Sequence, residues 1–389
     1  MNDRQEYRLS ETENEEIFQN DVKPYLLATA SLGLSRSEEP TMVIVGGQPG
    51  AGKSRSIDSV RLDLERSGGV MEIAADDLRK FHPKNDELMQ KDDRTAAHFT
   101  HADASAWAEK AERFAREQKF NVLIEGTLKT PENAAAKLAE YRDAGYFVEA
   151  RVIAVHERTS WQGVVGRYEQ QKEDAGIGRM TPKSVHDAAV TGVLASVEKI
   201  ETERLADRVR IDRRGAEQIY SNTLKADGNW ERPPAARQHI EAERDKPLSA
   251  QQWDAHVAGF DKIDALQQRH GRNASSDDMD MVRQLRAAAA LERERAAVRE
   301  RDVAAATSFA QEKPEVALAN HPRLAGAYAA LQAIETHARD NGLDDQAVRV
   351  VQARARENIA KNVEAGNYPE VNVRERIEVQ ATREKERER

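Results

Sequence analysis

Residues 47–54 match the phosphate-binding pattern GxxxxGK[ST] without a gap, and they directly follow a short apolar run at residues 42–45. A buried strand, a glycine-rich turn and a following helix are the context that this pattern needs. Glycines let backbone N–H groups close around phosphate oxygens, and the helix N-terminus adds the positive end of its dipole. The alternative is a tight glycine turn without a ligand, but the complete match in this context favours a nucleoside triphosphate site. The residues of this loop are Gly47, Gln48, Pro49, Gly50, Ala51, Gly52, Lys53 and Ser54.

The last two residues of the loop predict how the nucleotide is held. Lys53 is expected to reach the β- and γ-phosphates, and the hydroxyl of Ser54 to take a place on Mg²⁺. The predicted cofactors are therefore ATP, with GTP as the alternative nucleotide, and Mg²⁺.

Short apolar runs alternate with longer helical stretches from residue 41 to about residue 224. This alternation indicates a parallel sheet with crossover helices. The fold class that we predict is α/β, a P-loop kinase-like parallel sheet flanked by helices, with an appended all-α C-terminal region. The expected strands lie at 42–45, 70–73, 122–124, 148–155 and 209–211, and helices are expected at 55–66 and 102–118.

The chain of 389 residues is long enough for two or three folding units. Capping-box patterns predict two helix starts, at Ser10 with Glu13 and at Ser249 with Gln252. After residue 228 the composition shifts to Ala, Arg, Glu and Gln, which favours helices. Helices are expected at 276–306, 323–341 and 344–365. The predicted division is a helical segment and linker at 1–40, a P-loop domain at 41–226, a linker at 227–247, a helical accessory domain at 248–380 and a polar tail at 381–389.

Charge and composition narrow the classes of partner. A formal net charge of −9 argues against general nucleic-acid binding, so no nucleic-acid partner is expected. The chain has no cysteine, which excludes disulfides and thiolate metal sites. No apolar stretch approaches the length of a membrane span, and the N-terminus lacks a basic segment followed by an apolar run. We therefore expect a soluble cytoplasmic protein without a membrane partner.

Glutamate and arginine alternate in the helical half at residues 291–301. Such a mixture could form a coiled-coil seam or a binding surface. It is more typical of a solvated helix face with weak ion pairs, which is what we expect there.

Residues that follow the predicted strands are the candidates for chemistry, because ligands of open parallel sheets bind at the carboxyl ends of the strands. Asp76, Asp77 and Arg79 follow the second run, and Glu125 and Thr127 follow the third. In phosphoryl transfer a carboxylate must accept the proton of the attacking hydroxyl, and Asp76 is the candidate base. An equally open interpretation places Asp76 and Asp77 in the first turn of a helix as capping acids.

Further candidates lie in two loops. Glu125 could orient a Mg²⁺-bound water or hold substrate, and Thr127 and Lys129 lie where a loop could hydrogen-bond a sugar or phosphate. Arg167 and Arg179 flank a glycine-containing segment, 173–178, that could close over the nucleotide as a lid. The planar guanidinium suits the binding of phosphate oxygens in pairs, although arginines of this kind are often surface groups.

A metal pair is a weaker possibility. His98 and His101, followed by Asp103, have a spacing that a helix could turn towards one ion. No third strong ligand accompanies them, so the pattern favours a polar helix start over a zinc site.

Five motifs in this order resemble the zeta toxin family, the toxins of epsilon/zeta toxin–antitoxin systems. The resemblance extends over residues 41–224 and includes the closing segment 210–215. The motifs are the phosphate loop at 46–54, Asp-Asp-Leu-Arg-Lys-Phe-His-Pro at 76–83, Ile-Glu-Gly-Thr at 124–127, Gly-Arg-Tyr-Glu at 166–169, and Arg-Met-Thr-Pro at 179–182 followed by His-Asp at 186–187.

The resemblance implies an ATP-dependent kinase that phosphorylates the 3′-hydroxyl of the amino sugar of UDP-N-acetylglucosamine and so blocks cell-wall precursor use. It also implies a small helical epsilon-type antitoxin that blocks the nucleotide site. By position, Asp76 is the base and Ser54 binds Mg²⁺. The remaining implied roles belong to Lys53, Arg167 and Arg179 around the transferred phosphate, and to Arg79, Glu109, Glu125, Thr127 and Lys129 at the sugar nucleotide.

Two departures from the family pattern lie close to the implied sugar site. Ala74 stands where many relatives carry an additional acid, and Lys129 replaces an arginine. These changes bear on the preferred UDP-sugar more than on kinase activity. Two alternatives stay open: a P-loop phosphotransferase acting on another small hydroxyl substrate, and a nucleotide-gated interaction protein in which the helical half acts.

Overall fold

The computed structural model describes residues 6–30, 33–269 and 275–370. The described chain divides into two compact units. Unit 1 comprises residues up to 247 together with 256–286, and unit 2 comprises residues 248–255 together with those from 287 on. The predicted polar tail at 381–389 lies outside the described residues.

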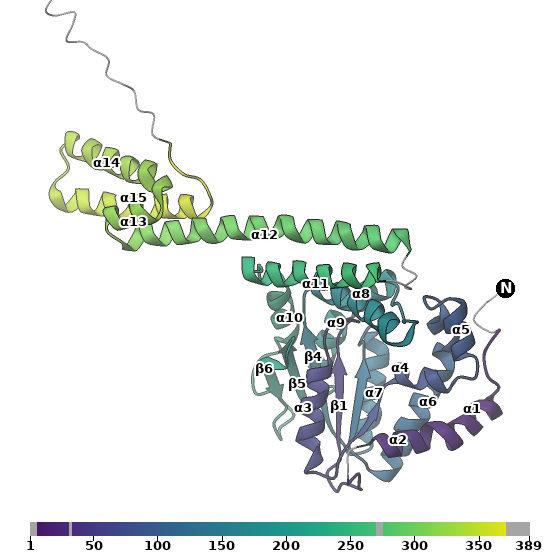
Figure 1. Ribbon diagram of the computed structural model, residues 1–389. Helices are drawn as coiled ribbons and strands as arrows, with labels where there is room; N and C mark the ends of the chain where they lie inside the picture. The colour runs from purple at the N-terminus through teal and green to yellow at the C-terminus, as the bar shows by residue number, and fades with distance from the viewer. Residues whose placement is uncertain (1–5, 31–32, 270–274, 371–389) are drawn as a thin grey trace, which may run out of the picture. The chain divides into compact units, whose positions relative to one another are not determined.

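Unit 1 is built on a six-stranded sheet with helices on both faces (Figure 1). Its strands follow the order β2-β3-β1-β4-β5-β6, and neighbours are parallel except for β6, which is antiparallel to β5. All five predicted strands are confirmed. The bounds are β1 Thr41–Gly46, β2 Met71–Ile73, β3 Val122–Gly126, β4 Phe147–Ala154, β5 Arg208–Arg213 and β6 Glu217–Thr223.

The helices of unit 1 follow the chain between and around these strands. Those before β3 are α1 Glu11–Ile17, the π-helical turn η2 Phe18–Val22, α2 Lys23–Thr29, α3 Ser54–Glu65, α4 Ala75–Leu78, the 3₁₀ turn η3 Arg79–Phe81, α5 Asn85–Lys91 and α6 Ala96–Gln118. Those after β3 are α7 Pro131–Asp143, α8 Glu157–Ala175, α9 Lys183–Thr202 and α10 Ala236–Asp245.

Alternation of side chains along the strands divides the core into two layers. On β1, Met42 and Ile44 face a large cluster that includes side chains of α6, α7, α9 and α10. Val43 and Val45 face the opposite side, where they pack with Ile57, Val60 and Leu64 of α3. The strand that leads into residues 47–54 is therefore buried on both faces, as a parallel strand requires.

Residues 227–247 do not form the linker that the sequence predicts. They contain α10, whose Ala236 and Ile240 are fully buried in the main core, and the bridge between Leu224 and Trp230 precedes it. The N-terminal helices likewise pack into this core through Phe18, Val22 and Leu26, so unit 1 is larger than residues 41–226. The predicted Ser10 capping box is confirmed.

Unit 2 is helical, as predicted. Buried side chains of α12, α13, α14 and α15, among them Phe309, Leu331 and Val363, form its core. Gly342 and Gly366 follow the ends of α14 and α15 with positive φ, which is common for glycine just past a helix. The helices beyond α10 are α11 Ala250–Gln268, α12 Ser276–Gln311, α13 Pro314–Asn320, the 3₁₀ turn η4 Pro322–Leu324, α14 Ala325–Asp340 and α15 Asp345–Glu364, and the boundary between the units falls within α11 and α12.

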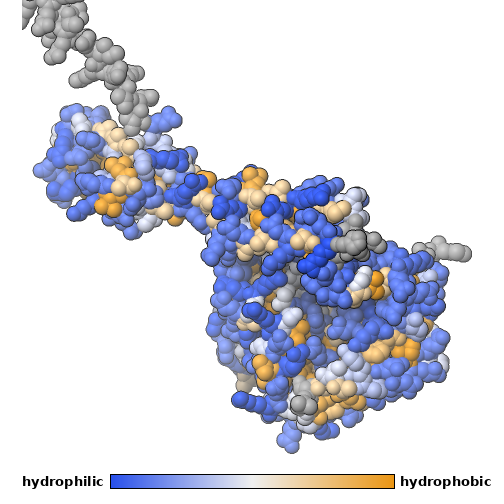
Figure 2. All heavy atoms as spheres, viewed as in Figure 1, coloured by the Kyte–Doolittle hydropathy of each residue, from blue (hydrophilic) through white to orange (hydrophobic). Residues whose placement is uncertain are grey.

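Hydrophilic side chains cover most of the face drawn in Figure 2, with apolar side chains scattered among them. None of the helices in the described part of the chain has the length and apolar character to span a membrane.

Candidate active site

Residues 47–53 make the turn between β1 and α3, and Ser54 is the first residue of the helix. Gly50 has a φ of +76°, and a Cβ atom on it would lie 1.9 Å from the carbonyl oxygen of Ser160. Only glycine fits there without a shift of α8 or of the loop. The Lys53 ammonium returns over the loop and donates to the Gly47 carbonyl at 3.2 Å. The segment thus has the strand, turn and helix of a phosphate loop.

Gln48 shows how the loop is fixed to the rest of unit 1. Its side chain is fully buried, and Nε2 donates to the Val155 carbonyl at 2.9 Å and to Ser160 Oγ at 3.3 Å. The amide therefore faces protein, and a phosphate contact from Gln48 is left to its backbone.

Glu125 lies beside Lys53, with 3.4 Å between Oε1 and Nζ. The strand register explains this pairing, because Val45 of β1 lies opposite Glu125 of β3. Desolvation lowers the pKa of Lys53, and the negative charge of Glu125 opposes that change. The lysine needs an anionic partner in this place, which Glu125 supplies here.

Asp76 lies in the first turn of α4, directly after β2, between two arginines. Arg79 Nε donates to Oδ1 at 3.0 Å, and Arg179 donates to Oδ2 at 2.8 Å. Desolvation acts to raise the pKa of Asp76, but the charges and hydrogen bonds of Arg179 and Arg79 outweigh it and hold the pKa well below its usual range. The side chain remains 56% exposed, so the carboxylate is ionised and accessible.

Arg167 on α8 completes the group of cations. Desolvation and the charge of Arg179 lower its pKa, whereas Asp76 and Glu125 act to raise it. Arg167 is exposed and makes no hydrogen bond or ion pair with residues in the described ranges. Its guanidinium is thus available to an incoming anion.

Three carboxylates share this region. Desolvation raises the pKa of Asp77, and the negative charges of Glu125 and Asp76 raise it further. Mutual repulsion of this kind is relieved by a bound cation, and carboxylate and hydroxyl oxygens are the protein ligands that Mg²⁺ prefers. Asp77 and Glu125, with the Ser54 hydroxyl, carry oxygen donors of the kind that Mg²⁺ prefers.

Arg79 also contacts α6. Its guanidinium donates to the Ala97 carbonyl, to Thr100 Oγ1 at 3.2 Å and to His101 Nδ1 at 3.2 Å. His101 thus takes part in an arginine contact, and no group of three His, Cys, Asp or Glu residues suited to a metal occurs in the described part of the chain. These contacts hold Arg79 against Asp76.

The remaining predicted substrate residues are less closely joined to this group. Thr127 and Lys129 lie in the loop after β3, which turns at Leu128 with a φ of +49° and packs on α9 through the hydrogen bond from Ser196 Oγ to the Leu128 carbonyl, 2.7 Å. Glu109 is exposed on α6, and within the described ranges no hydrogen bond or ion pair joins it to the other candidates. Its role stays a prediction.

Several residues that sequence reasoning missed position the arginines. The segment between α8 and α9 that carries Arg179 is tethered by Gln171, whose Oε1 accepts from the Arg179 amide at 2.9 Å. Asp93 accepts from Tyr168 Oη at 3.1 Å and from the Gly178 amide at 3.4 Å. Asp93 has no local motif, and its partners lie 75 and 85 residues away in the chain, so the sequence offered no signal for it.

A Ser-His-Asp arrangement lies beside the loop. Ser160 Oγ is 2.8 Å from His186 Nε2, and His186 Nδ1 is 3.0 Å from Asp187 Oδ1. Ser160 and His186 are fully buried, so the serine is not open to attack on a substrate. The arrangement instead joins the phosphate loop to α8 and α9 through Gln48.

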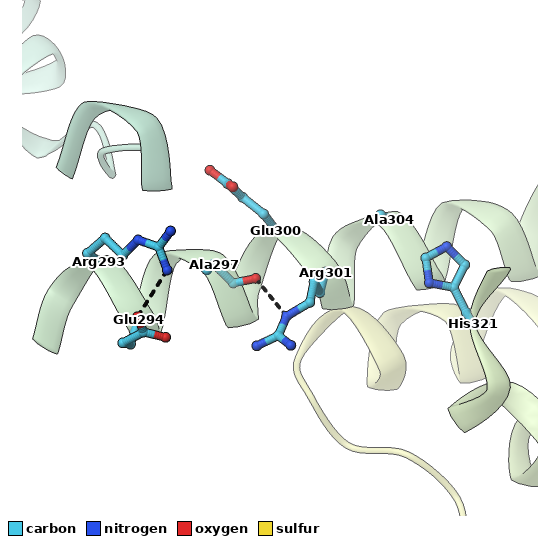
Figure 3. A pocket seen from close by; sticks show the side chains of 7 residues that line it. All are labelled: Arg293, Glu294, Ala297, Glu300, Arg301, Ala304 and His321. Carbon is cyan, nitrogen blue, oxygen red and sulfur yellow. Dashed lines mark hydrogen bonds and ion pairs between the residues drawn. The ribbon is translucent and has the colours of Figure 1, made fainter. Parts of the chain in front are cut away.

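A hollow of about 510 Å³ lies elsewhere, on α12 in unit 2 (Figure 3). Arginines and glutamates alternate along it: Arg293 donates to Glu294 at 3.0 Å, and Arg301 donates to the Ala297 carbonyl at 3.2 Å. Two arginines and two glutamates line the hollow, so its charges favour neither an anion nor a cation. Most of residues 291–301 are exposed, but Arg293 also pairs with Asp254 of α11 at 2.9 Å and Glu300 accepts from the Ala250 amide at 2.8 Å, so the expected solvated helix face is confirmed only in part.

Comparison with known proteins agrees with the geometry. The family model described as zeta toxin matches residues 26–225, which is more than half of the chain. The chain belongs to the zeta toxin family. Toxin PezT of Streptococcus pneumoniae is 28% identical over 197 residues, which are 50% of this chain and 77% of PezT. Toxin zeta of Enterococcus hirae is 29% identical over 191 residues, 49% of this chain and 66% of that protein.

A solved structure is also similar in fold. A chain from the PezAT chromosomal toxin–antitoxin system of Streptococcus pneumoniae aligns with a TM-score of 0.57 and 20% identity, covering 68% of this chain and all of that one. This zeta toxin family member therefore has the kinase-like P-loop fold of a toxin, with helices beyond the matched residues.

Proposed function

We propose that the chain is an ATP-dependent kinase that transfers the γ-phosphate to the 3′-hydroxyl of the amino sugar of UDP-N-acetylglucosamine or a related UDP-sugar. The observation that carries the proposal is the accessible carboxylate of Asp76, held between two arginines in the same site as the phosphate loop. Family membership supports a toxin kinase, and this arrangement supplies what phosphoryl transfer needs.

Each cation of the site has a role in this proposal. The backbone amides of the phosphate loop and Lys53 hold the β- and γ-phosphates, and Arg167 and Arg179 stabilise the charge that develops on the phosphoryl group in transit. Arg167 is free to do so at once. Arg179 is bonded to Asp76 in this state, so it exchanges a carboxylate for a phosphate oxygen when the nucleotide binds.

Asp76 acts as the general base in this proposal. Its low pKa makes it a weak base, but the transition state of phosphoryl transfer is loose and demands positioning more than basicity. When Arg179 turns to the phosphate, one of the two cations that depress the pKa of Asp76 is drawn away. The carboxylate is then better able to accept the proton of the sugar hydroxyl.

Mg²⁺ fits the donors described above. Ser54, with Asp77 or Glu125, would hold the ion beside the phosphates, where a bound cation neutralises negative charge on the triphosphate. The gathering of three carboxylates, Asp76, Asp77 and Glu125, in one region supports a cation there.

The UDP-sugar would lie on the side of Asp76 formed by the loop after β3. In this proposal Arg79, Glu125 and Thr127 bind or position it, with Lys129 and Glu109 at its periphery. Ala74, at the N-cap of α4, is buried and contributes no polar group. An acid at that position in relatives would add one, so the choice of sugar is the feature in which this chain is expected to differ.

An antitoxin is the proposed protein partner. The similar solved structure comes from a toxin–antitoxin system, and a small helical epsilon-type antitoxin that covers the nucleotide site would hold this kinase inactive.

The test is mass spectrometry of the full chain incubated with ATP, Mg²⁺ and a panel of UDP-sugars. We expect addition of one phosphoryl group to UDP-N-acetylglucosamine, abolished by Lys53→Ala and by Asp76→Asn. Asp58→Asn is the matched control, because Asp58 is an exposed acid on α3 that pairs with Arg61.

Two outcomes would overturn parts of the proposal. Full activity of Asp76→Asn would refute the general-base role. Binding of ATP without phosphorylation of any UDP-sugar would refute the sugar kinase and favour another hydroxyl acceptor or a nucleotide-gated interaction protein.

A further inference from the structure

Arg244 of α10 is a buried arginine beside the phosphate loop, and it lies beyond the residues matched by the family model. It is 9% exposed, and its guanidinium donates to the Gln48 side-chain oxygen at 3.1 Å and to the Val190 carbonyl at 3.0 Å. Its Nε is buried without a hydrogen-bond partner. A guanidinium is costly to bury, so the contact with Gln48 calls for a functional reason.

The contact decides how the Gln48 amide is oriented. An arginine only donates hydrogen bonds, so it selects the oxygen of the amide and turns the NH₂ group the other way. That NH₂ group then donates to the Val155 carbonyl, just past β4, and to Ser160 on α8. The opposite orientation would set the NH₂ group against the guanidinium and the oxygen against the Val155 carbonyl.

The orientation of Gln48 bears directly on the phosphate loop. Gln48 is the second residue of the loop and is followed by Pro49 and Gly50. The Gly50 backbone packs against the Ser160 carbonyl so closely that no Cβ atom fits between them. The anchor at Gln48 and the close contact at Gly50 both fix the loop to α8. The loop amides must be held within a fraction of an ångström to bind phosphate oxygens.

We propose that Arg244 is a positioning residue for nucleotide binding, which orients the Gln48 amide and thereby holds the phosphate loop in its binding conformation. The inference rests on the proposed function only in that the loop binds ATP. It assigns to α10, predicted as a linker, a part in the nucleotide site. Arg244 touches neither nucleotide nor acceptor and acts through Gln48.

The test is isothermal titration of the full chain with ATP and Mg²⁺. We expect Arg244→Met to raise the Kd for ATP about tenfold, as follows from losing a hydrogen bond with a charged donor. Arg237→Met on the same helix is the matched control, because the Arg237 side chain is 39% exposed and pairs with Glu198 and Glu241. Its Kd should stay within about twofold of the wild-type value. Arg244→Lys, which keeps the charge and one donor to Gln48, should give an intermediate Kd.

A double-mutant cycle with Gln48→Met separates positioning from general stability. If Arg244 acts through Gln48, Arg244→Met should change the Kd little once Gln48 is replaced. An equal loss of affinity with and without Gln48 would overturn the proposal, as would wild-type affinity in folded Arg244→Met. Circular dichroism and thermal unfolding establish that each variant is folded. A wild-type chain that does not bind ATP would instead refute the proposed function.

Discussion

Replacing Gly50 by alanine tests the phosphate-loop geometry against a control within the same chain. Gly50 and Gly145 have nearly the same φ, +76° and +78°. Alanine at either position should lower the free energy of unfolding by about 1–2 kcal/mol, because its side chain disfavours the left-handed backbone conformation. The two positions differ in their surroundings: a Cβ atom at Gly145 has no neighbour within 4 Å, whereas one at Gly50 lies 1.9 Å from the Ser160 carbonyl oxygen and 2.8 Å from the Val164 nitrogen.

The difference between the two variants isolates the contact between the loop and α8. A methyl group needs more than about 3 Å from a backbone oxygen, so the loop in Gly50→Ala must move by about 1 Å. We expect a displacement of that size in the site to weaken ATP binding about 100-fold. Gly145→Ala should lose about 1–2 kcal/mol in urea unfolding and keep the wild-type Kd for ATP. Gly50→Ala should lose at least as much stability and weaken ATP binding about 100-fold. Equal ATP affinity in the two variants would refute the reasoning.

Three further predictions concern stability. Glu149 is 1% exposed and accepts hydrogen bonds from Arg151 and Arg208, each at 2.8 Å. Glu149→Ala should lower the free energy of unfolding by about 3 kcal/mol, because it leaves Arg151 buried without this partner. A loss of less than about 1 kcal/mol in urea unfolding would contradict this. Ile240→Ala should lower the free energy of unfolding by about 2–4 kcal/mol in the same assay if α10 belongs to the core. The control is Leu62→Ala, which should cost less than about 1 kcal/mol because Leu62 is 65% exposed. The ion pairs of Asp76 should stabilise the fold above the ordinary carboxyl pKa of 3.8, and this stabilisation should be lost as the pH falls below that value. Between about pH 5 and pH 2, the urea midpoint of Asp76→Asn should therefore change less than that of the wild type. Parallel pH profiles of the two midpoints would refute this prediction.

Much of the fold could be predicted because its signals are local. Apolar runs that are buried on both faces stand out along β1 and β4, and the phosphate loop carries its own glycine spacing. Strand β6 was missed because it is a mostly polar edge strand, with only Ile219 and Tyr220 as large apolar side chains. Helix α10 was missed because its buried residues are few and follow the Pro-Pro pair at 233–234, which is typical of a linker.

In the candidate site, too, local sequence signals located some residues but not their long-range contacts. Asp76 and Glu125 could be located because they directly follow strands, whose carboxyl ends meet at one edge of the sheet. Lys53, Arg79 and Arg179 were candidates too, but which carboxylate each of them pairs with could not be predicted. Arg179 pairs with Asp76 across 103 residues, and Arg244 reaches Gln48 across 196. Nothing in the local sequence of an arginine distinguishes a buried clamp from a surface charge, so the structure is needed to separate Arg244 from Arg237.

The charges of the site also explain why a metal ion belongs to the proposed chemistry. Lys53, Arg79, Arg167 and Arg179 face three carboxylates, Asp76, Asp77 and Glu125, which leaves a single positive charge in surplus. A triphosphate brings more negative charge than that surplus can neutralise, and it must compete with Glu125 for Lys53 and with Asp76 for Arg179. Asp77 and Glu125 would hold a divalent cation bound with the nucleotide, and its charge would offset the phosphates and release Lys53 from Glu125. In the proposed reaction Lys53 and Arg179 would then act on the phosphoryl group, where their charge would lower the barrier.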